Sequence, residues 1–230
     1  HRPARRRPPA RGGARAGLAP AMTTQLVADL VQRAAALIPE RGRAVLGITG
    51  PPGAGKSTLA AAIVSGVGAA AALVPMDGFH LSNRVLLSLG RRERKGAPDT
   101  FDAGGYADLL RRLRRAEPGT VYAPDFDRTL DEPVAGSIAV PPEVRLVVTE
   151  GNYLLLPQAP WPEVTSQLDT TWYVHLDDDE RRRRLTARHE RHGMDPAAAR
   201  AWTAGTDEPN AVLVRAARDR ADLVVELPAG

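Results

Sequence analysis

The chain has 230 residues, 43% of them hydrophobic and 25% charged, which is enough to form one globular domain around a single core. It contains no cysteine, which excludes disulfide bonds, thiolate metal sites and a cysteine nucleophile. Since no run approaches the roughly 20 apolar residues of a membrane-spanning helix, we expect a soluble, cytoplasmic protein.

The net charge of +4 is concentrated at the start of the chain. Residues 1–21 hold six arginines and no acid, which leaves 25 basic against 27 acidic side chains, a net of −2, in the remainder. This Arg- and Pro-rich segment lacks apolar periodicity, so we predict a disordered basic leader over 1–21 and a folded domain over 22–230. Met22 is a candidate start of the native chain, and a nucleic-acid-binding arm or an organelle transit peptide are the alternatives for the leader. Because the body is acidic, we expect no specific nucleic-acid partner.

The predicted elements begin with a helix over 24–37, where leucines recur near helical spacing before Pro39. A buried strand over 44–49 then leads into a glycine-rich loop and a second helix. Further strands are predicted over 72–76, 145–149, 171–176 and 223–227, and further helices around 106–115, 179–192, 196–203 and 209–220. Strands that alternate with helices predict an α/β fold with a central, mostly parallel five-stranded sheet. The segment 84–142, rich in Gly, Pro and charge, is predicted to form an insertion that covers a substrate.

The glycine-rich loop over 50–57 reads Gly-Pro-Pro-Gly-Ala-Gly-Lys-Ser and matches G-x-x-x-x-G-K-[ST] in full. The glycines let backbone N–H groups face phosphates, Lys56 neutralises phosphate oxygens and the Ser57 hydroxyl ligates Mg²⁺. A chance glycine-rich turn is a poor alternative, because the chain has only two lysines. We therefore predict binding of ATP with Mg²⁺, with GTP as the open alternative donor. The predicted nucleotide contacts are Gly50, Gly53, Ala54, Gly55, Lys56, Ser57 and Thr58.

Two acids directly follow predicted strands, Asp77 after 72–76 and Glu150 after 145–149. Ligands of open parallel sheets gather at the carboxyl ends of the strands, so both acids are candidates for the chemistry. We predict that Asp77 accepts the proton of a substrate hydroxyl and that Glu150, with Ser57, holds Mg²⁺. Capping of the next helix or turn is the alternative for each.

Three further segments carry a family resemblance: Met76-Asp77-Gly78-Phe79-His80, the run from Arg94 to Asp102, and Glu150-Gly151-Asn152-Tyr153. Together with the loop they resemble the P-loop kinase family of bacterial pantothenate kinase, uridine kinase and phosphoribulokinase, over about 44–227. The resemblance implies a three-layer P-loop NTPase fold of the nucleoside and nucleotide kinase type, and it supports the roles given to Asp77 and Glu150. The layout is most similar to compact nucleoside kinase-like or fructose-transport-kinase-like members.

The acceptor side of the site is assigned mainly through this resemblance. Pro124-Asp125-Phe126-Asp127-Arg128 resembles the P-x-Y-D segment near the acceptor in uridine kinases, with Phe126 in place of tyrosine. The expected substrate contacts are Phe79, His80, Lys95, Phe126, Asp127, Arg128, Asn152 and Tyr153. Asn210 lies in a segment that is near adenine in related kinases and is therefore expected to contact the nucleotide, with helix capping as the alternative.

An arginine-rich helix is predicted to form a lid over 178–193. Asp177 can cap it, and one broad face carries Arg181, Arg184, Arg188 and Arg191. A closing lid can supply arginines that stabilise the charge of a transferring phosphoryl group, so we predict Arg184 and Arg188, with Lys56, as catalytic. The alternative is a solvated helix in a chain that has 29 arginines against two lysines.

The sequence therefore predicts an ATP-dependent phosphotransferase that moves the γ-phosphate to a hydroxyl group of a small metabolite. A nucleoside, a pantothenate-like compound and a sugar are open as acceptors, and a homodimer is open as the assembly. The alternative from another class is a nucleotide-hydrolysing switch or chaperone that acts through a protein partner. ATP turnover that needs no acceptor and is unchanged in Asp77→Asn would favour that alternative.

Overall fold

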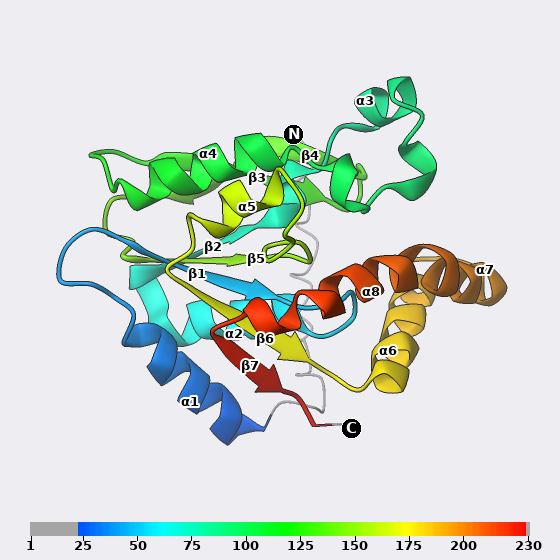
Figure 1. Cartoon of the computed structure of the whole chain (residues 1–230). Coiled ribbons are helices and arrows are strands. Elements are labelled where there is room, and N and C mark those ends of the chain that lie inside the picture. The colour runs from blue at the N-terminus through cyan, green and yellow to red at the C-terminus, as the bar shows by residue number, and fades with distance from the viewer. Residues whose placement is uncertain (1–22, 229–230) are drawn as a thin grey trace, which may run out of the picture.

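The computed structural model describes residues 23–228, so the leader predicted over 1–21 lies outside the described residues. A five-stranded sheet with the order β2-β5-β1-β6-β7 forms the centre (Figure 1). Its strands are β1 Ala44–Thr49, β2 Ala71–Pro75, β5 Leu146–Glu150, β6 Thr170–His175 and β7 Leu223–Glu226. Every neighbouring pair in this sheet is parallel. The predicted α/β fold with a five-stranded sheet is confirmed.

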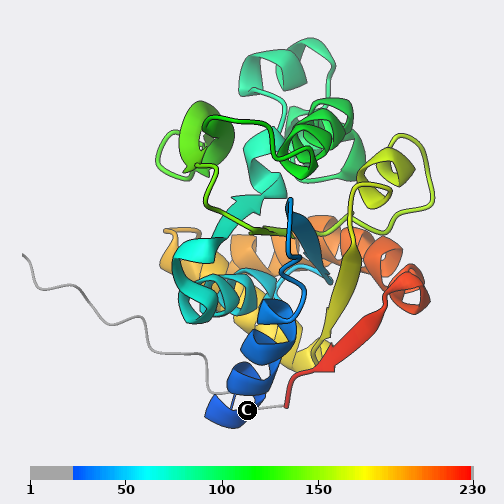
Figure 2. The same ribbon diagram turned by 90° about the vertical axis from the view of Figure 1, so that its left-hand side faces the viewer.

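Helices cover both faces of the sheet, which gives three layers (Figures 1 and 2). The helices are α1 Thr24–Ala35, α2 Lys56–Val67, α3 Asn83–Ser88, α4 Ala103–Arg114, α5 Trp161–Thr165, α6 Asp178–Arg191, α7 Pro196–Trp202 and α8 Glu208–Ala216. Val45 and Val147 pack with α4 and α5, whereas their strand neighbours Leu46 and Val148 pack with α1 and α2. Strands buried on both faces consist mainly of apolar residues, as parallel sheets require.

The segment 84–142 was predicted to form an insertion that covers a substrate, but only part of it lies outside the core of the domain. Its helix α4 belongs to one layer of the core, with Tyr106, Leu110 and Leu113 buried. The remainder contains α3 and an antiparallel hairpin of β3 Val121–Asp127 and β4 Glu132–Val140, which the sequence analysis did not predict. Both lie outside the central sheet, and the hairpin register shifts near Pro124, which cannot donate a ladder hydrogen bond.

The last two predicted helices follow one another without the break that the sequence analysis leaves between them. The helices predicted over 196–203 and 209–220 are α7 and α8, joined by a π-helical turn over Thr203–Asp207 into one nearly continuous rod. The side chain of Asp177 accepts hydrogen bonds from the N–H groups of Asp179 and Glu180, which is the predicted cap of α6. Within residues 23–228, no helix has the length and apolar character needed to cross a membrane.

Candidate active site

The loop between β1 and α2 has the backbone geometry expected of a phosphate-binding loop. Gly50, Gly53 and Gly55 have φ values of 149°, 84° and 97°, which residues with a side chain rarely adopt. Gly55 is the N-cap of α2, so the unpaired N–H groups at the start of this helix face the loop. Ser57 and Thr58 are exposed on this first turn.

Two of the predicted nucleotide contacts lie in the protein interior instead. The Ala54 side chain is fully buried in the core, and its N–H donates to Pro51 O at 3.1 Å, so it closes the loop itself. Gly50 packs against β6, where an added Cβ would lie 2.5 Å from Val174 O. Ala54 and Gly50 therefore shape the loop, and its other residues are left to contact a ligand.

Lys56 is 7% exposed, and its Nζ donates to Pro51 O at 3.1 Å. Burial lowers the pKa of Lys56 to about 8, although the carboxylates of Glu150 and Asp77 oppose this shift. A lysine ammonium desolvated in this way is suited to a ligand that brings further negative charge.

Two acidic side chains at strand ends, Glu150 and Asp77, lie next to the phosphate-binding loop. Ser57 Oγ donates to Glu150 Oε1 at 2.9 Å, and burial together with the neighbouring Asp77 carboxylate raises the pKa of Glu150. Asp77 lies in the 3₁₀ turn that directly follows β2. Because β5 lies between β2 and β1, the carboxyl ends of these strands converge on one point. A central cavity of about 90 Å³ is lined there by Pro52, Gly53, Lys56, Ser57, Asp77, Arg128, Glu150, Gly151, Asn152 and Arg188.

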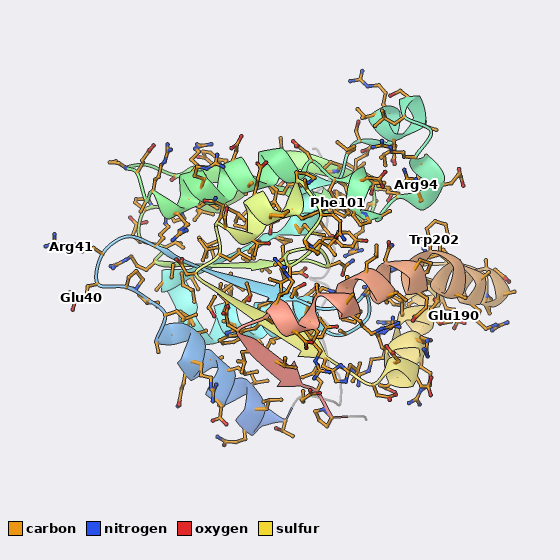
Figure 3. The ribbon with its side chains drawn as sticks, viewed as in Figure 1. Glu40, Arg41, Arg94, Phe101, Glu190 and Trp202 are labelled. Carbon is orange, nitrogen blue, oxygen red and sulfur yellow. The ribbon has the colours of Figure 1, made fainter. Side chains whose placement is uncertain are left out.

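An upper cavity of about 370 Å³ adjoins the central cavity. Of the predicted acceptor contacts, it is lined by His80, Lys95, Phe126, Arg128 and Asn152, together with Asp77. The two cavities share Pro52, Asp77, Arg128, Asn152 and Arg188. Phe101, which follows the loop before α4, and Trp202, at the end of α7, also line the upper cavity, and Figure 3 labels both.

The His80 ring packs against two aromatic side chains in the upper cavity. Its ring centroid lies 4.0 Å from that of Phe101 and 4.8 Å from that of Phe126. Its Nδ1 lies 2.8 Å from Asp77 O, and burial lowers the pKa of His80. His80 therefore contributes a neutral ring near pH 7 and holds the turn that carries Asp77.

Three of the predicted acceptor contacts are placed elsewhere by the structure. Phe79 packs on Tyr106 at a centroid distance of 4.8 Å, on the core side of its turn. Tyr153 is fully buried, and its hydroxyl donates to Gly96 O. Asp127 accepts hydrogen bonds from the N–H groups at 129 and 130 and so caps the β3–β4 turn. These side chains support the walls of the cavity because packing turns them away from it.

Lys95 lines the upper cavity, but its ammonium group already has partners. It donates to Asn83 Oδ1 at 2.9 Å and to Asp131 O, and it lies 3.1 Å from Asp131 Oδ2. Its side chain is 7% exposed. Lys95 therefore fastens the segment after α3 to the turn of the hairpin.

Helix α6 borders a side cavity of about 320 Å³ on the other side of the loop. Gly55, Ser57 and Thr58 line it together with Arg184 and Arg188. The Nη2 of Arg184 is buried without a hydrogen-bond partner in the described part of the chain. Arg188 lines the side, central and upper cavities, so the predicted lid helix does place both arginines at the loop.

Asn210 differs from its predicted place. It lines the upper cavity, with His80 and Phe126, and not the side cavity next to Thr58. The structure also adds a pair that sequence reasoning missed: His189 Nε2 lies 2.8 Å from Asp207 Oδ2, and both line the upper cavity. No sequence spacing marks this pair, because its members come from α6 and from the π-helical turn.

The fold and the loop geometry can be compared with known proteins. No protein-family model matches the chain. The chain is 34% identical over 175 residues to "Putative uridine kinase C227.14" of Schizosaccharomyces pombe, covering 72% of this chain and 74% of the relative. The chain belongs to the uridine kinase-like family of P-loop kinases.

Two further comparisons agree with this membership. The chain is 37% identical over 145 residues to "ATP-dependent kinase-like protein notR'" of Aspergillus versicolor, covering 59% of this chain and 84% of that protein. The structure of a "putative fructose transport system kinase" from Silicibacter sp. TM1040 superimposes with a TM-score of 0.80 at 39% identity, covering 89% of this chain and 99% of that one. The names of these relatives differ in their acceptors, so membership alone leaves the acceptor of this kinase open.

Proposed function

We propose that this kinase binds ATP in the side cavity and transfers its γ-phosphate, across the central cavity, to a hydroxyl group of a small metabolite held in the upper cavity. One observation supports this most directly: Asp77, Arg128 and Arg188 line both the upper cavity and the central cavity over the phosphate-binding loop. A carboxylate and two guanidinium groups thus lie between the cavities that we assign to the two ligands. The ATP dependence named for the Aspergillus relative agrees with this assignment.

The reaction needs a base and a set of cations. Asp77 would accept the hydroxyl proton as the acceptor oxygen bonds to the γ-phosphorus, and ADP would leave with the electron pair of the broken P–O bond. Lys56, Arg128 and Arg188 would stabilise the negative charge spread over the transferring group. Arg128 Nη2 lies 3.7 Å from Asp77 Oδ2, so a guanidinium group of the hairpin lies beside the proposed base.

Ser57 and Glu150 fit a magnesium ion. They offer a hydroxyl and a carboxylate oxygen at the loop, and the raised pKa of Glu150 indicates a carboxylate that a cation would stabilise. Within residues 23–228, no three His, Asp or Glu side chains form a metal-binding group of their own. Mg²⁺ in such sites usually takes one or two protein oxygens together with phosphate oxygens, and when bound it would neutralise phosphate charge.

An acceptor screen tests the proposal directly. ADP release from ATP and Mg²⁺ would be measured with pantothenate, uridine, cytidine, fructose, ribulose 5-phosphate and related alcohols. We expect one chemical class to stimulate release and to appear as a phosphorylated product. Steady ATP hydrolysis that no alcohol stimulates would contradict the proposal and favour the nucleotide-dependent switch.

Asn210 tests which cavity receives the acceptor. Asn210 is 7% exposed and lines the upper cavity. We expect Asn210→Ala to raise the acceptor KM by about tenfold, the value of one lost hydrogen bond to a ligand, and to leave ADP affinity unchanged. Arg184→Ala is the reciprocal control, because it should weaken ADP binding without changing the acceptor KM. Loss of ADP affinity in Asn210→Ala would restore the original assignment of this residue to the nucleotide.

We also propose a cytoplasmic location and a homodimeric assembly for this kinase. Cell fractionation tests the first, and light scattering of the purified protein tests the second.

A further inference from the structure

Arg181 is a fully buried arginine in the first turns of α6 that none of the roles above uses. Its Nη1 donates to Pro52 O at 3.2 Å, within the phosphate-binding loop. Its Nε donates to Asp178 Oδ1 at 3.0 Å, and its Nη2 donates to Glu208. The guanidinium therefore links the loop to α6 and α8, and each of its three nitrogens has a partner.

The contact between α6 and the loop is a close one. A Cβ added to Gly53 would lie 2.9 Å from Arg181 O and 3.2 Å from the Cβ of Leu185. Only glycine fits there with its φ of +84°. The N-terminal half of α6 therefore packs directly on the phosphate-binding loop.

The peptide group between Pro52 and Gly53 explains what Arg181 can do. Pro51 and Pro52 have no N–H, and the N–H of Ala54 is bonded to Pro51 O, so among residues 51–54 only the N–H of Gly53 is left to face a ligand. This peptide is trans, so its C=O and N–H point in opposite directions within one plane. A hydrogen bond that holds Pro52 O toward α6 therefore turns the Gly53 N–H away from α6. Gly53 lines the central and side cavities.

We propose that Arg181 is a positioning residue that orients the Gly53 N–H toward the phosphates of the bound nucleotide by gripping the carbonyl on the opposite side of the same peptide. The proposal rests on the assignment of this loop to ATP. The positive charge of Arg181 also polarises the peptide and makes its N–H a stronger donor to an anion. Arg181 itself touches neither nucleotide nor acceptor in this arrangement.

The chain contains a matched control in Arg215. Arg215 donates to the same two carboxylates, to Asp178 Oδ1 at 3.0 Å and to Glu208 Oε1 at 2.9 Å, without a contact to Pro52. In Arg181→Met, both carboxylates keep Arg215 as their partner, so the ion-pair network survives in part. In Arg215→Met, both carboxylates keep Arg181, and the link to the loop is unchanged.

Selective labelling makes the peptide group directly observable. The sequence has only two Pro–Gly bonds, Pro52–Gly53 and Pro118–Gly119. Full-length protein labelled with carbonyl-¹³C proline and ¹⁵N glycine therefore shows two amide signals in a carbonyl-filtered NMR experiment. Gly119 lies in an exposed turn and serves as an internal reference. We expect ADP to move the Gly53 signal downfield in the wild type and to leave the Gly119 signal in place.

The comparison of variants decides the proposal. We expect Arg181→Met to lose most of the ADP-induced shift of Gly53 and to weaken ADP binding by about tenfold, while Arg215→Met keeps the shift and an affinity within about threefold. An unchanged shift and affinity in Arg181→Met, or equal losses in both variants, would overturn it. If ADP does not move Gly53 in the wild type, the assignment of the loop to the nucleotide fails as well.

Arg181→Lys covers the case in which Arg181→Met does not fold. It keeps the charge, but one ammonium cannot reach three oxygens in the fixed fork geometry of a guanidinium. We expect a partial shift of Gly53 and an affinity between those of the wild type and Arg181→Met. An affinity and a shift equal to those of Arg215→Met would count against the positioning role.

Discussion

Replacement of Asp77 by Asn is expected to lower acceptor-dependent phosphate transfer by about 10²–10⁴-fold, the usual contribution of a general base. Asn keeps the size of the side chain and its place after β2 but cannot accept the hydroxyl proton. Nucleotide binding should stay within about threefold, because the loop contacts do not involve Asp77. The measurement is kcat for the acceptor found in the screen, alongside ADP affinity by titration.

Asp127→Asn is the matched control for this substitution. Asp127 belongs to the same hairpin as Arg128, but its carboxylate caps the β3–β4 turn through two backbone N–H groups. An asparagine oxygen can accept the same bonds, so we expect a change in kcat of less than about twofold. Equal losses in Asp77→Asn and Asp127→Asn would indicate a general effect on the acceptor side and would remove Asp77 from the chemistry.

Lys56→Met is expected to weaken ADP binding and to lower phosphate transfer by about 10²–10³-fold, because it removes the cation aimed at the phosphates. The ammonium of Lys56 is buried, is bonded within the loop to Pro51 O and lines both the central and the side cavity. Met retains much of the side-chain volume, so the loop should keep its shape. Isothermal titration with ADP and single-turnover transfer would measure the two effects separately.

The second lysine of the chain supplies the control. The Lys95 side chain is also largely buried, but its partners are Asn83 and Asp131 instead of the loop. Lys95→Met should loosen the hairpin and raise the acceptor KM, with ADP affinity unchanged. If both lysine variants lose ADP binding to the same extent, the loss reports a weakened fold and not a missing phosphate contact.

Catalysis in this site combines local sequence motifs with contacts across the fold. The loop, the turn after β2 and the end of β5 are each short segments next to a strand, and the order β2-β5-β1 brings them together. Arg128 reaches the same point from the hairpin, and Arg188 from α6. The proposed acceptor side is therefore built largely by elements other than the loop, and the names of the relatives differ in their acceptors.

The parallel sheet, the phosphate-binding loop and the two strand-end acids could all be predicted from the amino-acid sequence. These features depend on residues that are adjacent in the chain: apolar runs make buried strands, and the loop motif consists of eight consecutive residues. The hairpin was missed because Pro124 and Gly136 lie inside its two strands, where both residue types are disfavoured. These same features hide an antiparallel pair that is exposed on one face.

Which side chains of the acceptor segments face the cavity depends on the tertiary structure and could not be predicted from the sequence. Phe79, Tyr153 and Asp127 belong to the right segments, but packing against Tyr106, the bond to Gly96 and the turn of the hairpin direct them elsewhere. Arg181 was predicted to share a face with Arg184 and Arg188, and it is instead held by α8 and the loop. Sequence spacing fixes directions only within one element, whereas the direction of a side chain relative to a cavity depends on how separate elements pack.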